Sequence, residues 1–295
     1  MKKSNWGRIL LILSTMIWGC GLVAQKSGMD YLGPFWFTAI RCTLGGLSLF
    51  PLVYFAGKRR LPDEKEKADR KTTVKASLIC GLALSALIFF QQVGISYTSV
   101  GKAGFITALY IIITPLLERL LGKRISKYIW ISVVIALAGL SMLTLSSGVE
   151  KLTIGDFLML CGAFANSVQI LAIDKWVQKV DSVKLSCYQF LVVGAVNLPL
   201  ALIFETFSWE AVVAGAVPII YAGIFSCGIG YTLQAVGQQY TPPSQTSLLL
   251  SLETVFTLLA GMLFLNEVMT ATEYAGCAVM FAAIILSQKQ PDKIK

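Results

Sequence analysis

Ten long runs with few or no charges follow one another along this chain of 295 residues. Each run is close to the roughly 20 apolar residues that a helix needs to cross a hydrocarbon core of about 30 Å. Charged residues make up 14% of the chain, whereas a soluble domain carries about 25%. The sequence therefore predicts an all-α integral membrane protein with ten transmembrane helices. The expected spans are residues 7–26, 34–56, 74–96, 102–121, 128–147, 154–174, 184–204, 212–236, 244–265 and 271–288.

The distribution of positive charge predicts the orientation of these spans. If the N-terminus is cytoplasmic, the inner segments carry 21 Lys and Arg, and the outer segments carry only Lys26, Lys102 and Lys151. Lys and Arg accumulate on the cytoplasmic side of membrane proteins. We therefore expect a multi-pass protein of the cell (plasma) membrane, embedded in the lipid bilayer, with both termini cytoplasmic. This distribution also accounts for the net charge of +9 without nucleic acid as a partner.

Two register shifts reveal an internal repeat. A shift of 143 residues places Gln91–Thr98 on Gln234–Thr241, with five identities in eight positions. A shift of 148 places Gly46 on Gly194 and Pro51 on Pro199. The sequence predicts two five-helix repeats, residues 1–150 and 151–295. Because five is odd, the second repeat enters the membrane from the opposite side, an inverted arrangement that suits alternating access with a ligand site near the midplane.

Several short segments resemble a known family. They are Trp18-Gly19, Ala39-Ile40-Arg41, Tyr97–Ala103, Ile106–Tyr110, Thr114–Leu117, Ser247–Glu253 and Asn266-Glu267. In this order, the chain resembles the drug/metabolite transporter superfamily, specifically the ten-helix EamA-type exporters. The resemblance implies transport of amino acids, other metabolites or drug-like compounds. In that family a proline often follows the glutamate of the ninth helix. Here Thr254 stands in that place, so the sequence does not support a helix break there.

Two charged residues lie within predicted spans. Glu253 is about ten residues into its span, where a charge costs on the order of 2.5–3.5 kcal/mol. It is a candidate substrate contact or protonation site, or else a structural acid held by hydroxyls or Arg41. Arg41 lies roughly 10 Å from the outer end of its helix. It could reach the interface, pair with Glu253 or bind a substrate carboxylate.

Polar and aromatic residues at mid-span form a candidate cavity lining, because amides and phenols in lipid need partners. Pairing between helices is the simpler alternative for each one. Together with Glu253 and Arg41, the candidates are Trp18, Gln91, Tyr110, Asn166, Gln169, Tyr188, Gln189, Tyr231 and Gln234. Pro115 is expected to kink its helix.

The residue types present favour a transporter over an enzyme. The chain has no histidine, and none of its seven cysteines forms a CxxC pair, so no metal site or cofactor is expected. No P-loop is present, so ATP is not expected to be the direct energy source. We predict a secondary active transporter that works by alternating access, and the resemblance implies export of a small molecule. Proton coupling would use Glu253 as the only deeply buried acid. The alternatives to a transporter are a membrane-embedded lipid-modifying enzyme and a passive channel. The sequence is also compatible with a homodimer.

Overall fold

The computed structural model describes residues 3–59, 70–95, 97–98, 100–144, 152–265 and 269–289. Throughout these ranges the regular structure is helical, without a strand. The helices are α1 (Lys3–Met29), α2 (Pro34–Arg59), α3 (Arg70–Ile95), α4 (Val100–Thr107), α5 (Tyr110–Leu120), α6 (Lys127–Thr144), α7 (Ile154–Val177), α8 (Ser182–Phe204), α9 (Trp209–Ala214), α10 (Ala216–Ile220), the π-helix η1 (Tyr221–Gly230), α11 (Tyr231–Gln238), α12 (Pro243–Leu250), α13 (Leu252–Leu265) and α14 (Ala271–Ser287).

Seven helical segments of the described chain are long and apolar enough to cross a membrane. They are Pro34–Phe55, Arg70–Gly94, Ala103–Leu120, Ile154–Val177, Ser182–Phe204, Ala216–Gln238 and Pro243–Phe264. Lys127–Leu143 and Ala271–Ser287 are shorter apolar helices, and α1 covers the expected first span. The predicted all-α membrane fold is thus confirmed. The count of ten crossings remains a prediction, because seven segments of the described chain meet the length and hydropathy that a span requires.

The helices form two compact units, each assembled from both halves of the sequence. Unit 1 comprises Met1–Ser85 and Ala172–Tyr240, and unit 2 comprises Ala86–Leu171 and Thr241–Lys295. The long helices α3 and α7 each contribute to both units. Neither unit therefore corresponds to a contiguous half of the chain.

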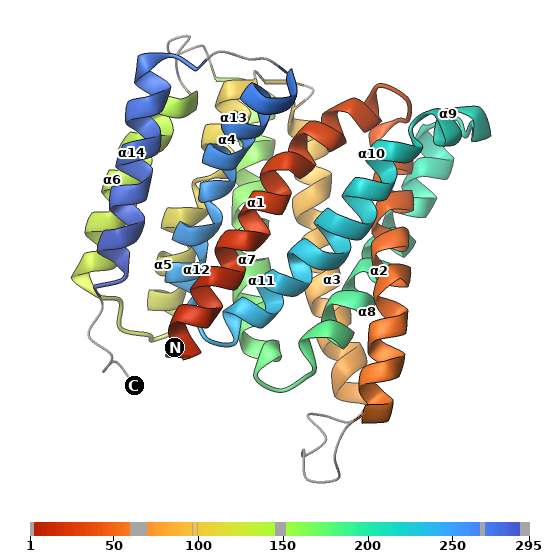
Figure 1. Cartoon of the computed structure of the whole chain (residues 1–295), viewed down its shortest axis with the longest axis horizontal. Coiled ribbons are helices and arrows are strands. Elements are labelled where there is room, and N and C mark those ends of the chain that lie inside the picture. Colours follow the sequence, from red (N-terminus) through yellow and green to blue (C-terminus); the bar gives the residue numbers. More distant parts are fainter. Residues whose placement is uncertain are drawn as a thin grey trace. The chain divides into compact units, whose positions relative to one another are not determined.

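In unit 1, α2 and α8 lie side by side and touch through glycines (Figure 1). A Cβ on Gly46 would meet Leu191 and the carbonyl of Cys187, and a Cβ on Gly194 would meet Thr43 and lie near the carbonyl of Ala39. These contacts are reciprocal, because adding 148 to 46, 43 and 39 gives 194, 191 and 187. Without side chains at the two glycines, the helix backbones approach closely, as small residues allow in membranes.

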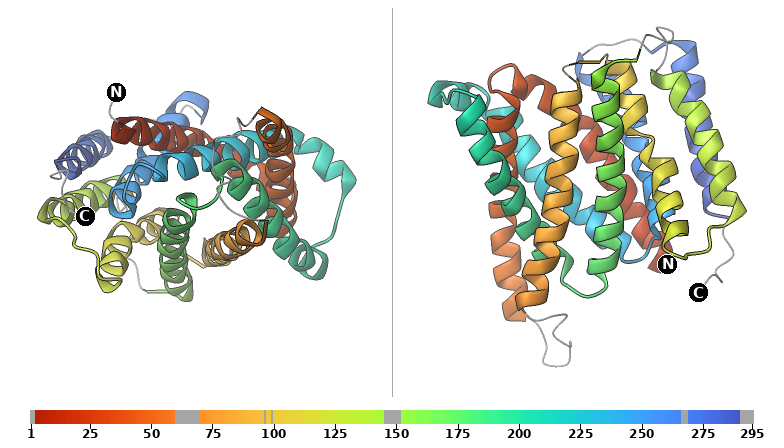
Figure 2. Two further views of the ribbon diagram at one scale, coloured as in Figure 1. Left: turned by 90° about the horizontal axis from the view of Figure 1, so that it is seen from below. Right: turned by 180° about the vertical axis from the view of Figure 1, so that it is seen from behind.

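In unit 2, α6 and α14 lie side by side (Figure 2). A Cβ on Gly139 would come within 3.0 Å of the carbonyl oxygen of Gly276, and a Cβ on Gly276 would come within 2.9 Å of that of Gly139. As in unit 1, glycine at the crossing permits backbone contact between helices.

The fourth and ninth expected spans each contain a short break in the α-helical hydrogen-bond pattern, although the backbone stays right-handed helical at Leu109 and Ser251. The fourth is divided into α4 and α5 at Ala108 and Leu109, and the ninth into α12 and α13 at Ser251. At both places a hydrogen bond joins residues three positions apart instead of four. The N–H of Ile111 donates to the carbonyl of Ala108, and the N–H of Thr254 donates to the carbonyl of Ser251. The break precedes Glu253, and α13 continues through Thr254, which stands where the family often has proline.

The two interruptions stand at the same place in the chain repeat. Val100 and Thr107 bound α4, whereas Pro243 and Leu250, each 143 residues later, bound α12. The same shift places Tyr110, the first residue of α5, on Glu253 in the first turn of α13. The helix ends thus repeat at the spacing found in the sequence.

The eighth expected span contains a wider helix that the sequence did not predict. The chain runs through α9 and α10, then follows π-helical geometry from Tyr221 to Gly230 before α11. Gly223 and Gly228 within η1 lie against α2, where a Cβ on Gly223 would come within 3.0 Å of the carbonyl oxygen of Arg41. Such π-helical turns are rare and occur frequently at functional sites.

Candidate functional site

Two aromatic rings from neighbouring helices of unit 1 pack against Tyr231. The ring of Trp18 on α1 lies 4.4 Å from that of Tyr231 on α11, and Phe190 on α8 meets the same tyrosine edge-on at 5.0 Å. The indole N–H of Trp18 donates to the carbonyl of Ser226 at 3.2 Å, as a buried tryptophan requires. Two predicted site residues, Trp18 and Tyr231, are therefore brought into contact, and Phe190 is a member that the sequence analysis missed.

Arg41 is buried in unit 1, on the helix α2 beside η1. Its Nη1 donates to the side-chain oxygen of Gln25 at 3.0 Å, and its guanidinium lies 5.4 Å from the ring centre of Phe37. Its Nε has no hydrogen-bond partner within the described part of the chain. Arg41 therefore has a buried N–H donor without an acceptor among the described residues. Leaving a buried polar group unpaired costs free energy.

Two glutamine amides of unit 1 are also buried and incompletely bonded. Neither the oxygen nor the nitrogen of the Gln189 amide has a partner among the described residues, and the same holds for the Gln234 oxygen. Gln234 is one turn from Tyr231 on α11. Tyr188, next to Gln189, is half-buried. Gln189 corresponds to Arg41 under the 148-residue shift, so the repeat places a charge on one helix and an amide on the other.

The remaining candidates lie in unit 2. Tyr110 and Thr114 on α5 face α7, where the Ser167 hydroxyl accepts a hydrogen bond from Thr114 at 3.2 Å. Asn166 is half-buried beside Ser167, and Gln169 is buried with its amide nitrogen unpartnered within the described chain. Gln91 is half-buried on α3 and lies against Gly162 of α7.

Glu253 occupies the first turn of α13, directly after the interruption at Ser251. Its backbone carbonyl accepts the Thr257 hydroxyl at 2.8 Å. Its carboxylate has no hydrogen bond or ion pair within the described residues, and its side chain is half-buried rather than fully buried. A carboxylate in the first helical turn is favoured by the helix dipole, which partly offsets its cost inside a span.

Glu118 is a buried acid that was not predicted, because Glu253 was expected to be the only deeply buried one. Glu118 on α5 is 2% exposed. Its carboxylate accepts the backbone N–H of Ser244 at 2.8 Å and the Ser244 hydroxyl, and it forms an ion pair with Lys123 at 3.1 Å. Pro242 and Pro243 begin α12 without donors, so Glu118 satisfies the first N–H that follows. The two consecutive prolines were the sequence feature that could have indicated a capping residue for α12.

Other acids also stabilise helix ends. Asp181 caps α8, Glu273 forms a capping box in α14, and Glu205 accepts two N–H groups at the start of α2. Each of these carboxylates has a structural role that accounts for its position. Glu253 differs, since it lies within a span and has no such partner in the described chain. Among the same residues, no three His, Cys, Asp or Glu side chains come together to hold a metal ion.

Fold and sequence together define a class of protein: a multi-pass, all-α membrane protein with interrupted helices in both halves. The chain belongs to the EamA-like transporter family, whose model matches residues 5–145 and again 153–288. A crystal structure with 18% sequence identity superimposes with a TM-score of 0.81, covering 96% of this chain and 98% of the other. That similarity supports the fold alone.

Relatives in other organisms are named as transporters. An uncharacterized transporter of Archaeoglobus fulgidus is 27% identical over 96% of this chain and 86% of its own. The uncharacterized transporter YwfM of Bacillus subtilis is 24% identical over 99% and 97%. A probable terminal-alkyne amino-acid exporter of Streptantibioticus cattleyicolor is 20% identical over 98% and 95%. This chain is accordingly a membrane transporter, and a small molecule is its substrate.

Proposed function

We propose that the protein is a secondary active exporter that moves a small metabolite across the plasma membrane by alternating access. The observation that carries the proposal is the pair of interrupted helices, α4–α5 and α12–α13, at equivalent places in the two halves. Transporters built from inverted repeats often form their substrate and ion sites at discontinuous helices. Tyr110 and Glu253 directly follow the two breaks.

Three observations support an inverted duplication of residues 1–150 and 151–295. The family model matches once in each part, and the helix ends repeat at the offsets of 143 and 148 residues. The third is the reciprocal contact of α2 with α8, in which position 46 meets 187 while 39 lies near 194. Reciprocity of this kind is a two-fold relationship. Because these positions run in opposite directions along the two helices, the axis is perpendicular to them and thus in the membrane plane.

The surroundings of Arg41 favour a substrate that carries a carboxylate. Its Nε is an unused donor in unit 1, and guanidinium groups bind carboxylates strongly. The aromatic cluster of Trp18, Phe190 and Tyr231 in the same unit offers apolar contact. An amino acid with an apolar side chain combines both features, and one relative is named as a probable amino-acid exporter. We therefore propose an amino acid or a similar carboxylate as substrate.

Glu253 is the group proposed to couple transport to protons. It is the acid of the described spans that lacks a partner, so its protonation need not disrupt a helix cap. A carboxylate that alternates between protonated and ionised forms would allow the membrane proton gradient to drive export.

Transport into inverted membrane vesicles tests the proposal. With an imposed pH gradient, the wild type is expected to accumulate labelled amino acid against its concentration gradient, and Glu253→Gln is expected to lose the dependence on the pH gradient. Glu210→Gln, which changes an exposed acid in the first turn of α9, is the matched control. Equilibration without accumulation would indicate a passive channel, and an unchanged pH dependence in Glu253→Gln would exclude this residue as the coupling site.

Binding separates the role of Arg41 from that of Glu253. Arg41→Gln is expected to abolish the stabilisation of the purified protein by the substrate, whereas Glu253→Gln is expected to retain it, because a ligand stabilises the folded state in proportion to its occupancy. An Arg41→Gln variant that binds carboxylates as the wild type does would contradict the proposed substrate class.

A further inference from the structure

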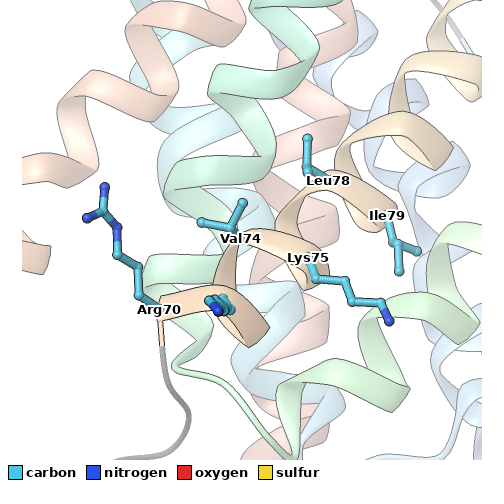
Figure 3. A pocket seen from close by; sticks show the side chains of 6 residues that line it. Arg70, Val74, Lys75, Leu78 and Ile79 are labelled. Carbon is cyan, nitrogen blue, oxygen red and sulfur yellow. The ribbon is translucent and has the colours of Figure 1, made fainter.

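One face of α3 combines three positive charges with three apolar side chains. Arg70, Lys71, Val74, Lys75, Leu78 and Ile79 line an open depression on this helix. Their spacing of four residues in two adjacent rows places them on a single helical face. In Figure 3, Arg70 and Lys75 extend to opposite sides of Val74, and Leu78 and Ile79 follow further along the helix. The face therefore changes from charged to apolar along its length.

The buried residues of α3 show that this face points outward. Thr73, Ala76, Ser77 and Cys80 are buried. Ala76 and Cys80 belong to a core cluster of unit 1 with residues of α7, α8 and α11, including Trp176. By contrast Val74, Leu78 and Ile79 are 44%, 45% and 39% exposed. The charged and apolar face thus points away from the protein core, and in a membrane its neighbour is lipid.

The chemistry of the face matches one class of lipid. The side chains of Arg70, Lys71 and Lys75 have no ion pair or hydrogen bond within the described part of the chain. They stand at the first turns of a candidate span that begins at Arg70, where phospholipid headgroups lie. Leu78 and Ile79 are roughly 12–14 Å further along the helix axis, at the depth of acyl chains. Basic residues at this boundary attract anionic lipids.

We propose that this face of α3 is a binding site for an anionic phospholipid. The headgroup phosphate lies between Arg70, Lys71 and Lys75, and an acyl chain lies along Val74, Leu78 and Ile79. A zwitterionic lipid fits the apolar part equally well but gains less from three cations. The site is independent of the substrate site, since it uses none of the residues proposed to bind or couple the substrate.

Titration of lipid into the detergent-purified full-length protein tests this inference, with thermal stability as the readout. Phosphatidylglycerol is expected to stabilise the wild type at a lower concentration than phosphatidylcholine. In the triple variant Arg70→Gln, Lys71→Gln, Lys75→Gln, the half-effective concentration of phosphatidylglycerol is expected to rise about 100-fold, at about fivefold for each cation removed. The variant Arg70→Lys, Lys71→Arg, Lys75→Arg keeps the charge and is expected to retain most of the effect.

The matched control is Arg119→Gln, Arg124→Gln, Lys127→Gln, which removes three exposed charges elsewhere and is expected to leave the titration unchanged. Equal loss in this control would overturn the proposal, because the effect would then be a general response to net charge. Equal stabilisation by phosphatidylcholine, or by soluble glycerol phosphate alone, would also overturn it. If the triple Gln variant does not fold, native mass spectrometry of the wild type is the deciding test. The protein is expected to retain phosphatidylglycerol in preference to phosphatidylcholine. Equal retention of the two lipids would contradict the site.

Discussion

The carboxylate of Glu205 occupies the space that a side chain on Gly33 would take. Gly33 precedes α2, and Glu205 follows α8. From this position Glu205 accepts the N–H groups of Phe35 and Trp36 at 2.9 and 2.8 Å. At the equivalent place before α8, Asp181 accepts the N–H groups of Val183 and Lys184 with its own side chain. The start of α2 is therefore capped by a residue distant in the sequence, whereas the start of α8 is capped by the residue directly before it.

Glu205→Ala is expected to lower the free energy of unfolding by about 1–3 kcal/mol, since it leaves two backbone donors without their acceptor. Adding Gly33→Asp should recover about 1 kcal/mol, because aspartate at this position can cap α2 as Asp181 caps α8. Thermal unfolding in detergent measures both changes. Gly33→Asp in the presence of Glu205 is expected to destabilise instead, through crowding and repulsion of two carboxylates. Recovery by Gly33→Ala would contradict the capping explanation.

Glu118→Ala is expected to be among the more destabilising single changes in unit 2. It leaves the N–H and hydroxyl of Ser244 and the ammonium of Lys123 without their shared acceptor, at a cost of about 2–4 kcal/mol. The decrease in melting temperature of the purified protein measures this cost. Glu210→Ala, at an exposed position, should change stability by less than about 0.5 kcal/mol. Similar melting temperatures for the two variants would show that Glu118 does not hold α12.

Gly46→Ala and Gly194→Ala are expected to destabilise the protein, each by about 1–3 kcal/mol, because the added methyl groups force α2 and α8 apart. The effect of Gly46→Ala is expected to be the larger, because its Cβ would lie 3.0 Å from the carbonyl oxygen of Cys187, whereas that of Gly194 would lie 3.4 Å from that of Ala39 and overlap the Thr43 side chain. Gly162→Ala is the control, since its Cβ would meet its nearest neighbour at an ordinary 3.5 Å, and alanine favours the helix by up to about 1 kcal/mol. Tolerance of alanine at 46 and 194 would argue against close backbone contact.

The predicted orientation is tested by labelling introduced cysteines in a variant without the native ones. Glu210→Cys, in a segment predicted to be outside, should react with a membrane-impermeant maleimide in intact cells. Arg124→Cys, in a segment predicted to be cytoplasmic, should react only after the membrane is opened. Both positions are exposed, so a difference in reactivity reports the side of the membrane. The reverse pattern would overturn the orientation with cytoplasmic termini.

Much of the helical architecture follows from the sequence because a span in lipid must be apolar and must satisfy its own backbone hydrogen bonds. Charge-free runs therefore predicted most helices close to their observed ends, as for Pro34 and Ser182 at the starts of α2 and α8. The interruptions before Tyr110 and Glu253 were not predicted. They depend on a few backbone hydrogen bonds that apolar composition does not encode. The π-helical turns of η1 were missed for the same reason.

The candidate site was predicted as a set of residue types, and only some of its members meet in space. Polar and aromatic side chains in lipid are costly enough to be noticed individually, so Trp18, Arg41 and Tyr231 were identified without a structure. That Trp18 and Tyr231 share a contact with Phe190 depends on how α1, α8 and α11 pack. Phenylalanine was not identified because its apolar ring gives no signal among many apolar residues.

The sequence by itself determined that this chain is a helical membrane protein with a repeated pattern, since hydropathy and repeat spacing depend only on residue order. Only the tertiary structure decided what each acid does. Glu118, Glu205 and Asp181 hold helix ends, and Glu253 has no partner among the described residues. The physical reason is that the role of a carboxylate depends on which N–H groups and cations lie within about 3 Å of its oxygens. Those neighbours are often distant in sequence, as Glu118 and Ser244 are.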